Sequence, residues 1–181
     1  MSDTKTILLH VCCAPCAGGC VETLLERQYR VILFFANSNL DTQEEFQRRL
    51  EAVRTLAQAC QLELHVAPYQ HQDWLCHVAG LEQEPERGAR CPRCFSFSLT
   101  LAAQKCRELS CDAFTTSLTV SPHKDSRLLL QLGAEFENFA PFDFKKQDGF
   151  LRSRNLARKY NFYLQNYCGC EFSRKAVSVP T

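Results

Sequence analysis

Three groups of cysteines carry the side chains with the most evident chemistry in this sequence. They are Cys12, Cys13 and Cys16 in a CCAPC run, Cys91 and Cys94 in CPRC, and Cys168 and Cys170 in CGC. Thiolates bind soft metals and iron–sulfur clusters, and paired thiols exchange with disulfides. The three groups therefore predict a metal site, a redox site, or both.

The number of cysteines also bears on the compartment and on the class of site. The chain has twelve cysteines in 181 residues. Its start is polar and it has no apolar run near the roughly 18 residues that span a membrane, so we expect a cytoplasmic protein. Structural disulfides are rare in that compartment, which favours metal binding or redox chemistry.

Charge is distributed unevenly along the chain. The formal net charge is only +1, but residues 141–181 hold eight Lys and Arg against three Asp and Glu. A basic C-terminal quarter favours an anionic partner such as nucleic acid.

Apolar runs and helical periodicities alternate along the chain, which predicts one α/β domain over residues 1–181. We expect a Rossmann-like parallel sheet that carries the cysteines on one face. The predicted strands are 6–11, 30–36, 62–67, 112–117 and 136–144. The predicted helices are 17–28, a helix to about Cys60 capped by Asp41, a short one near Trp74, 91–110, one to about Leu132 capped by Ser121, and 152–160.

The first two cysteine groups should meet at the carboxyl end of the first strand, where open α/β sheets place their active sites. Cys91 and Cys94 open a predicted helix with two residues between them, so their thiols can reach one metal centre. Cys12 and Cys13 can join them only if the chain turns at Ala14-Pro15. Four thiolates from two loops match either a [4Fe–4S] cluster or a structural zinc, and CPRC alone could be a thioredoxin-type dithiol.

The remaining cysteines divide into a third pair and isolated residues. Sulfurs at Cys168 and Cys170 can close only a small, strained ring, which suits an easily reduced catalytic relay; two exposed or metal-bound thiols are the alternative. Cys16 can be a ligand or a packed residue. Five cysteines are expected to pack as small hydrophobes: Cys20, Cys60, Cys76, Cys106 and Cys111.

The basic C-terminal quarter also contains aromatic side chains that could stack on unpaired bases. Ser121 and Lys124 could hold a phosphate, or Ser121 could simply cap a helix. The residues expected to meet RNA phosphates are Lys145, Lys146, Arg154 and Arg158, with Arg152, Lys159, Arg174 and Lys175 beside them.

The motifs together resemble one family across nearly the whole chain. HVCCAPC, EPERGARCPRCF, FTTSLTVSPHK, DFKKQDGF and QNYCGCEFS follow one another as in the QueH-type epoxyqueuosine reductases. The resemblance implies an oxidoreductase that catalyses the last, cobalamin-independent step of queuosine biosynthesis, in which an epoxide on the wobble nucleoside of tRNA becomes an alkene. It also implies a [4Fe–4S] cluster on Cys12, Cys13, Cys91 and Cys94, and a redox-active Cys168–Cys170 disulfide.

The resemblance has further implications for cofactors and fold. Some relatives carry an aspartate where this chain has Cys16, which makes Cys16 a candidate ligand of an additional iron ion. An external electron donor of unknown identity is implied. The fold should be similar to tRNA-modifying enzymes of the HUP/ATP-pyrophosphatase group. Residues 12–19 lack the Ser-Gly-Gly-x-Asp-Ser loop of that group, so ATP is not expected.

Two functions from other classes also fit the thiols and the basic tail. One is a zinc-stabilised RNA-binding module, and the other is a thiol redox sensor without catalysis. The metal and the use of the Cys168–Cys170 pair distinguish them from a reductase.

Overall fold

The computed structural model describes residues 4–146 and 148–174. It is an α/β fold with one parallel sheet, whose strands lie in the order β3-β2-β1-β4. The strands are β1 (Thr6–Val11), β2 (Arg30–Phe35), β3 (Glu63–Val66) and β4 (Ala113–Thr116). The α-helices are α1 (Ala14–Glu26), α2 (Gln43–Ala59), α3 (His71–His77), α4 (Arg90–Glu108), α5 (Ser126–Gly133) and α6 (Gly149–Lys159). Two 3-10 turns are η1 (Ser117–Val120) and η2 (Glu171–Ser173).

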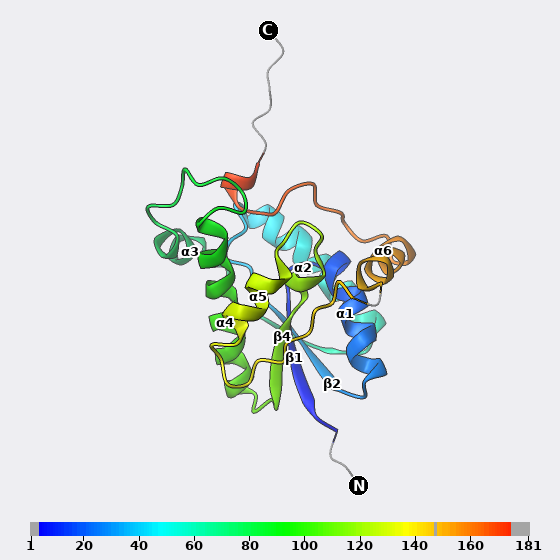
Figure 1. The fold of residues 1–181 in the computed structure, drawn as a ribbon. Coiled ribbons are helices and arrows are strands. Elements are labelled where there is room, and N and C mark those ends of the chain that lie inside the picture. Colours follow the sequence, from blue (N-terminus) through cyan, green and yellow to red (C-terminus); the bar gives the residue numbers. More distant parts are fainter. Residues whose placement is uncertain (1–3, 147, 175–181) are drawn as a thin grey trace.

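Both faces of the sheet are covered, which explains why its central strands are apolar throughout. Ile7 and Leu9 of β1 pack with α1 and α2, whereas Leu8 packs on the opposite face against α4. Figure 1 shows α4 and α5 on one side of the sheet and α1 and α6 on the other. The expected fold class is therefore confirmed. Among the described residues, none of the helices has the length and apolar character needed to cross a membrane.

Helix α1 begins three residues earlier than predicted. Cys13 occupies the N-cap and Pro15 lies in the first turn, where its missing N–H costs no hydrogen bond. Consequently the loop after β1 is only Cys12 and Cys13, and Cys16 lies in the first turn of the helix.

Two predicted helix caps are wrong. Thr42, and not Asp41, caps α2, because its hydroxyl accepts the N–H of Glu45. Ser121 does not begin a helix: it ends η1, and α5 starts five residues later. The cap of α5 is Asp125, whose carboxylate accepts two backbone N–H groups.

The predicted strand at 136–144 is also wrong. Only Phe139 bridges to Phe114 of β4. Further along, the hydroxyl of Thr119 donates to the carbonyl of Phe142 and accepts the N–H of Phe144. A side chain therefore satisfies the backbone groups that a sheet ladder would have used.

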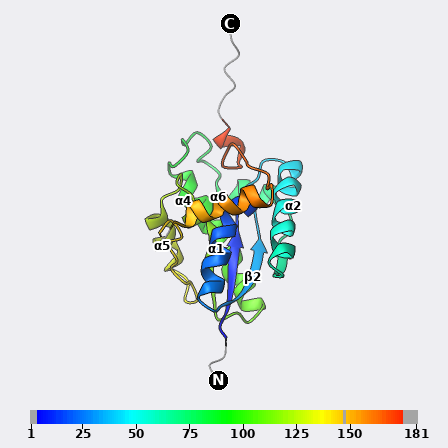
Figure 2. The same ribbon diagram turned by 90° about the vertical axis from the view of Figure 1, so that its right-hand side faces the viewer.

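Helix α6 lies across α1 (Figure 2), and Gly19 allows the close approach. A Cβ at Gly19 would lie 2.5 Å from the carbonyl oxygen of Gly149 and 2.7 Å from Ser153 Oγ. A Cβ at Gly18 would instead meet the flexible side chain of Leu156. Ser153 Oγ also accepts the N–H of Gly19 at 3.1 Å.

We predict that Gly19→Ala lowers the free energy of unfolding by about 2 kcal/mol, because backbone atoms cannot give way to the new methyl. Gly18→Ala is the matched control. The free energy of unfolding of this variant should change by no more than about 1 kcal/mol, since alanine's higher helix propensity offsets the cost of displacing the Leu156 side chain. Urea denaturation followed by circular dichroism measures both, and an equal loss in the two variants would contradict the packing argument.

Candidate metal and redox site

Three thiols at the junction of β1 and α1 form a close group. The Sγ atoms of Cys12, Cys13 and Cys16 all lie within 4.8 Å of one another, and those of Cys12 and Cys13 are 3.8 Å apart. Ser117, directly after β4, donates to Cys12 Sγ at 3.4 Å, and the side chain of Gln165 donates to Cys13 Sγ at 3.0 Å. Among the described residues, no other set of three His, Cys, Asp or Glu side chains is this close.

The protons of this group are shared unequally. Hydrogen bonds with the Cys13 and Cys16 thiols hold the pKa of Cys12 well below its usual value. The same bond to Cys12 raises the pKa of Cys13 to about 12, and that of Cys16 is also raised. A metal ion bound by these thiols would displace their protons, as thiolate ligation requires.

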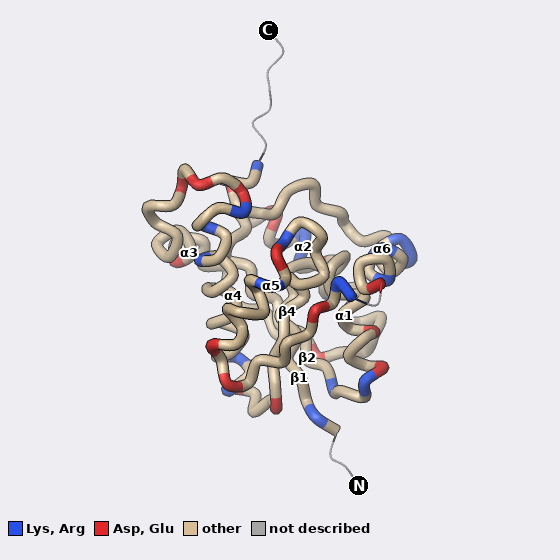
Figure 3. Tube along the Cα trace, viewed as in Figure 1, with Lys and Arg blue, Asp and Glu red and all other residues tan. Residues whose placement is uncertain are grey.

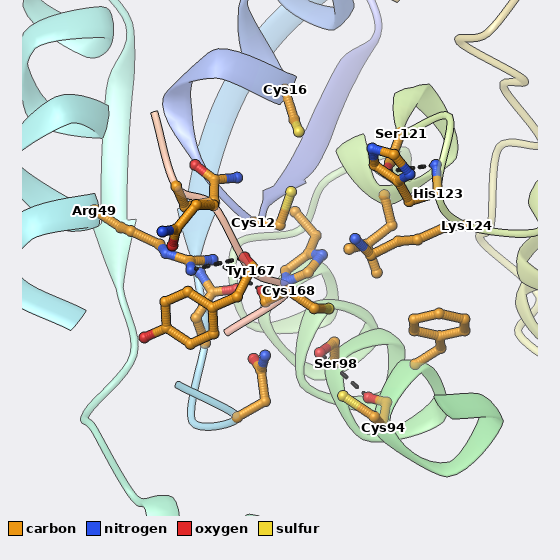
Figure 4. A pocket seen from close by; sticks show the side chains of 17 residues that line it. Cys12, Cys16, Arg49, Cys94, Ser98, Ser121, His123, Lys124, Tyr167 and Cys168 are labelled. Carbon is orange, nitrogen blue, oxygen red and sulfur yellow. Dashed lines mark hydrogen bonds between the residues drawn. The ribbon is translucent and has the colours of Figure 1, made fainter. Parts of the chain in front are cut away.

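Cys91 and Cys94 lie near the start of α4, and Cys94 shares a cavity with this group. The cavity has a volume of about 350 Å³ and is lined by Cys12, Cys16, Cys94 and Cys168. Cys91 lines an adjoining cavity of about 340 Å³ together with Cys168. Figure 4 shows Cys12 and Cys16 pointing toward one another and Cys94 approaching from α4.

The start of α4 is held by Arg90, whose side chain is buried. Its Nη1 donates to the carbonyls of Leu81 and Glu82 at 3.1 and 3.2 Å. The guanidinium also lies 4.7 Å from the ring centroid of Phe172, which follows the CGC run. Arg90 therefore ties the CPRC turn to the segment that carries the third cysteine pair.

Cys168 and Cys170 have different surroundings. Cys168 lines the cavity, whereas Cys170 is buried against Trp74 and Val78, and both are free thiols. Gly169 between them has φ +137°, a conformation that favours glycine. A Cβ there would also lie 2.5 Å from Leu40 Cδ2, a side-chain atom that would have to shift, so the backbone conformation is the main reason for glycine.

Arg49 of α2 reaches the same segment, and it is not among the predicted site residues. Its Nη1 donates to the carbonyl of Cys168 at 3.0 Å, and its Nε to Glu45 at 2.7 Å. The signal was present, because Arg49 lies among the buried positions Phe46, Leu50 and Val53 and four residues after a glutamate.

Lys124 is a second cation at the cavity. It lies in the loop between η1 and α5, lines both cavities, and in Figure 4 points toward the thiols. Although burial alone would lower the pKa of Lys124, nearby Cys168 and Cys12 raise it. Within residues 4–146 and 148–174, its Nζ has no hydrogen-bond or ion-pair partner.

His10, by contrast, is fully buried at the end of β1 and held at both nitrogens. Nδ1 lies 3.0 Å from Thr116 Oγ1, and Nε2 lies 3.3 Å from the carbonyl oxygen of Ala36. Burial lowers the pKa of His10. This histidine therefore serves to join neighbouring strand ends.

The residues expected to meet RNA are in different settings. Arg154 and Arg158 of α6 and Lys146 are exposed, and Figure 3 shows the positive charge of α6. Lys145 instead donates to the carbonyl of Lys124, which holds the loop beside the cavity. Arg152 forms an ion pair with Glu26 at 2.9 Å. Lys175 lies outside the described residues.

Most of the isolated cysteines pack as predicted. Cys20, Cys106 and Cys111 are buried, Cys60 is partly buried, and Cys76 is exposed on α3. Phe144 and Phe162, two aromatic residues of the basic C-terminal quarter, belong to the core, so they are not available to stack on bases.

Comparison with known proteins places these features in a family. A family model described as "Epoxyqueuosine reductase QueH" matches residues 7–176. The chain belongs to this family. It is 36% identical to the epoxyqueuosine reductase QueH of Streptococcus pyogenes serotype M1 over 98% of this chain and 74% of that protein. The QueH of Thermotoga maritima is 31% identical over 93% of this chain and 90% of its own length.

A solved structure supports the fold assignment. The U34-tRNA thiolase NcsA from Methanococcus maripaludis, determined with its [4Fe-4S] cluster, matches with a TM-score of 0.61. The match covers 96% of this chain and 63% of the thiolase at 14% sequence identity. At this identity the likeness shows a shared fold.

Proposed function

We propose that this QueH-family chain reduces epoxyqueuosine to queuosine at the wobble position of tRNA, in the cytoplasm. The observation that carries the proposal is that thiols from three distant segments line connected cavities at the carboxyl edge of the sheet. Such a convergence is difficult to explain by packing, because Cys12, Cys16 and Cys168 all remain accessible to the cavity.

The reaction needs two electrons and two protons. Both C–O bonds of the epoxide break, an alkene forms, and the oxygen leaves as water. Oxidation of the Cys168 and Cys170 thiols to a disulfide releases the same two electrons and two protons, so one dithiol balances one turnover. An external reductant, a dithiol or another two-electron donor, must then restore the pair.

The donor set fits an iron–sulfur cluster. Soft thiolates surround the cavity, three of them already in contact range, and Cys94 faces them from α4. Cys12, Cys13, Cys91 and Cys94 would hold a [4Fe–4S] cluster, with Cys16 as the candidate ligand of an additional iron ion. A bound cluster would supply one-electron transfer and a Lewis-acid iron.

The chain's own residues have separate tasks at the cavity. Lys124 Nζ, free of other partners among the described residues, donates a hydrogen bond to the epoxide oxygen as negative charge develops there. Phe95 and Leu118 form apolar parts of the wall and limit the access of water. Cys168 presents its thiol to the same space.

We place the RNA backbone along α6 and the neighbouring loop. Arg154, Arg158 and Lys146 are exposed there, and no ion pair within the described residues engages them. Phosphate contacts of this type supply affinity without reading sequence.

One prediction from this proposal concerns the metal. Protein purified without oxygen should be brown, and Cys91→Ser or Cys94→Ser should lose the colour, because a ligand of the cluster is missing. Cys76→Ser, which alters an exposed cysteine of α3, is the control and should keep it. Visible absorption with iron and sulfide analysis measures the result. Colourless protein with stoichiometric zinc would instead support an RNA-binding module and remove the reductase proposal.

The second prediction concerns the electron pair. Cys168→Ser and Cys170→Ser should keep the cluster absorption, since neither residue belongs to the four-thiolate set. Turnover of epoxyqueuosine-containing tRNA should fall by more than about 100-fold, because no disulfide can form. Full multiple-turnover activity would rule out a relay. Loss of iron in these variants would indicate that the two thiols are metal ligands.

The third prediction concerns RNA. Arg154→Gln with Arg158→Gln should weaken binding of a tRNA anticodon stem-loop and lower the slope of log affinity against log salt by about 1.5. The double variant Arg30→Gln with Arg54→Gln, which alters arginines paired with Glu63 and Glu51, is the control. Unchanged affinity and slope in the α6 variant would place the RNA surface elsewhere.

A further inference from the structure

We propose that Arg49 is a positioning residue that holds the Cys168-Gly169-Cys170 segment in its dithiol form, with Cys168 directed to the cavity. The inference rests on the proposed redox role of that pair. It assigns a function to a buried charge that the reaction itself does not use.

Arg49 binds the segment through its backbone and not through its thiols. Nη1 donates to the carbonyl oxygen of Cys168 at 3.0 Å, and Nη2 to that of Tyr167 at 3.4 Å. The guanidinium also lies 5.5 Å from the ring centroid of Tyr167. A planar guanidinium can hold two successive carbonyls at once, which an ammonium cannot do with the same geometry.

Glu45 fixes the direction of this guanidinium. Its carboxylate accepts from Arg49 Nε at 2.7 Å, and the hydroxyl of Tyr163 donates to the same carboxylate at 3.1 Å. Arg49 is 3% exposed and Glu45 is 5% exposed. Two charges buried on the apolar face of a helix are costly to desolvate, so their retention here calls for a positional role.

The next residue along the segment is also held. The N–H of Asp41, two residues before α2, donates to the carbonyl of Gly169 at 2.9 Å. A Cβ at Gly169 would approach Arg49 Nη1 to 3.2 Å as well as Leu40. The carbonyls of three successive residues, 167 to 169, are therefore bound by α2 or by the residues directly before it.

This arrangement favours the dithiol. Cys168 lines the cavity while Cys170 packs against Trp74, and both are free. A disulfide between residues two apart closes a tight ring with a Cβ–Cβ separation of about 3.5–4.5 Å. Its formation would draw Cys168 from the cavity or Cys170 from Trp74, and the backbone contacts of Arg49 oppose that movement. Stabilising the reduced form makes a couple more oxidising and easier for an external donor to restore.

The test is a thiol–disulfide equilibrium of the cluster-loaded full chain in glutathione buffers without oxygen. Oxidised glutathione takes two electrons from the Cys168 and Cys170 thiols, giving one protein disulfide and two reduced glutathiones. Samples are quenched in acid, alkylated and cleaved after Lys and Arg. The peptide 160–174 contains only these two cysteines, so its mass reports the pair despite the ten others.

Arg49→Lys keeps the charge but removes the two-carbonyl contact. We expect its oxidation constant with glutathione to rise about tenfold, because the dithiol loses its support. Glu45→Gln should shift it in the same direction by less, and it serves as the second variant if Arg49→Lys does not fold. Arg54→Lys, an exposed arginine of the same helix, is the matched control and should titrate like the unaltered chain.

The outcomes separate this inference from the proposed function. If the unaltered chain forms no disulfide in peptide 160–174 at any glutathione ratio, the relay itself is wrong. If it titrates and both Arg49→Lys and Glu45→Gln match it, or shift toward the dithiol, the relay stands and the role of Arg49 is overturned.

Discussion

A parallel sheet that is covered on both faces leaves only the ends of its strands open for chemistry, and the site depends on that constraint. Helices cover Leu9 on one face and Leu8 on the other, so neither face can admit a substrate. The strands all end at one edge, where Cys12 follows β1 and Ser117 follows β4. Asn37, two residues after β2, donates to the carbonyl of Val11 at 2.8 Å and ties the strand ends together. Groups that follow different strands lie close together here because the strands that carry them are neighbours in the sheet.

Two cations near these thiols are used in different ways, and their partners explain the difference. Arg49 forms an ion pair with Glu45 and donates to backbone carbonyls, so its role is structural. Lys124 is held by its backbone alone: its N–H donates to Ser121 and its carbonyl accepts from Lys145. The ammonium of Lys124 therefore lies at the cavity without a hydrogen-bond or ion-pair partner among the described residues. A low-dielectric site strengthens the interaction of such a group with a developing negative charge.

The sequence was sufficient where one physical effect dominates. Strand β1 was predicted residue for residue, and β2 within one residue, because burial on both faces demands continuous apolar runs. It was insufficient where side chains compete for the same backbone groups. Asp41 has the chemistry of a helix cap but instead accepts from the hydroxyl of Tyr167, a residue more than a hundred positions away, and Thr42 takes its place.

The candidate site shows the same division. The spacing of CCAPC and CPRC identified motifs that both lie where helices begin, and Cys12 and Cys16 of the first share a cavity with Cys94 of the second. Spacing could not show that Cys16 joins Cys12 and Cys13, since that depends on α1 beginning directly after Cys13. Lys145 has the charge expected of an RNA contact, and the structure adds that its ammonium donates to a backbone carbonyl within the chain. Patterns of residue type identify which groups can act, whereas long-range contacts determine which of them are free to do so.

Two buried arginines explain how a short C-terminal segment can present a thiol precisely without belonging to a strand or a helix. Arg49 holds the carbonyl of Cys168 from α2, and Arg90 packs on Phe172 from the start of α4. The Cys168–Cys170 pair thus lies between anchors on two helices that cover opposite faces of the sheet. Arg90 is adjacent to Cys91, so a backbone movement of the Cys168–Cys170 segment that shifts Phe172 would alter a contact made at the start of the CPRC turn. The CPRC turn and the Cys168–Cys170 segment are therefore linked through the contact of Arg90 with Phe172, although they lie more than seventy residues apart in the chain.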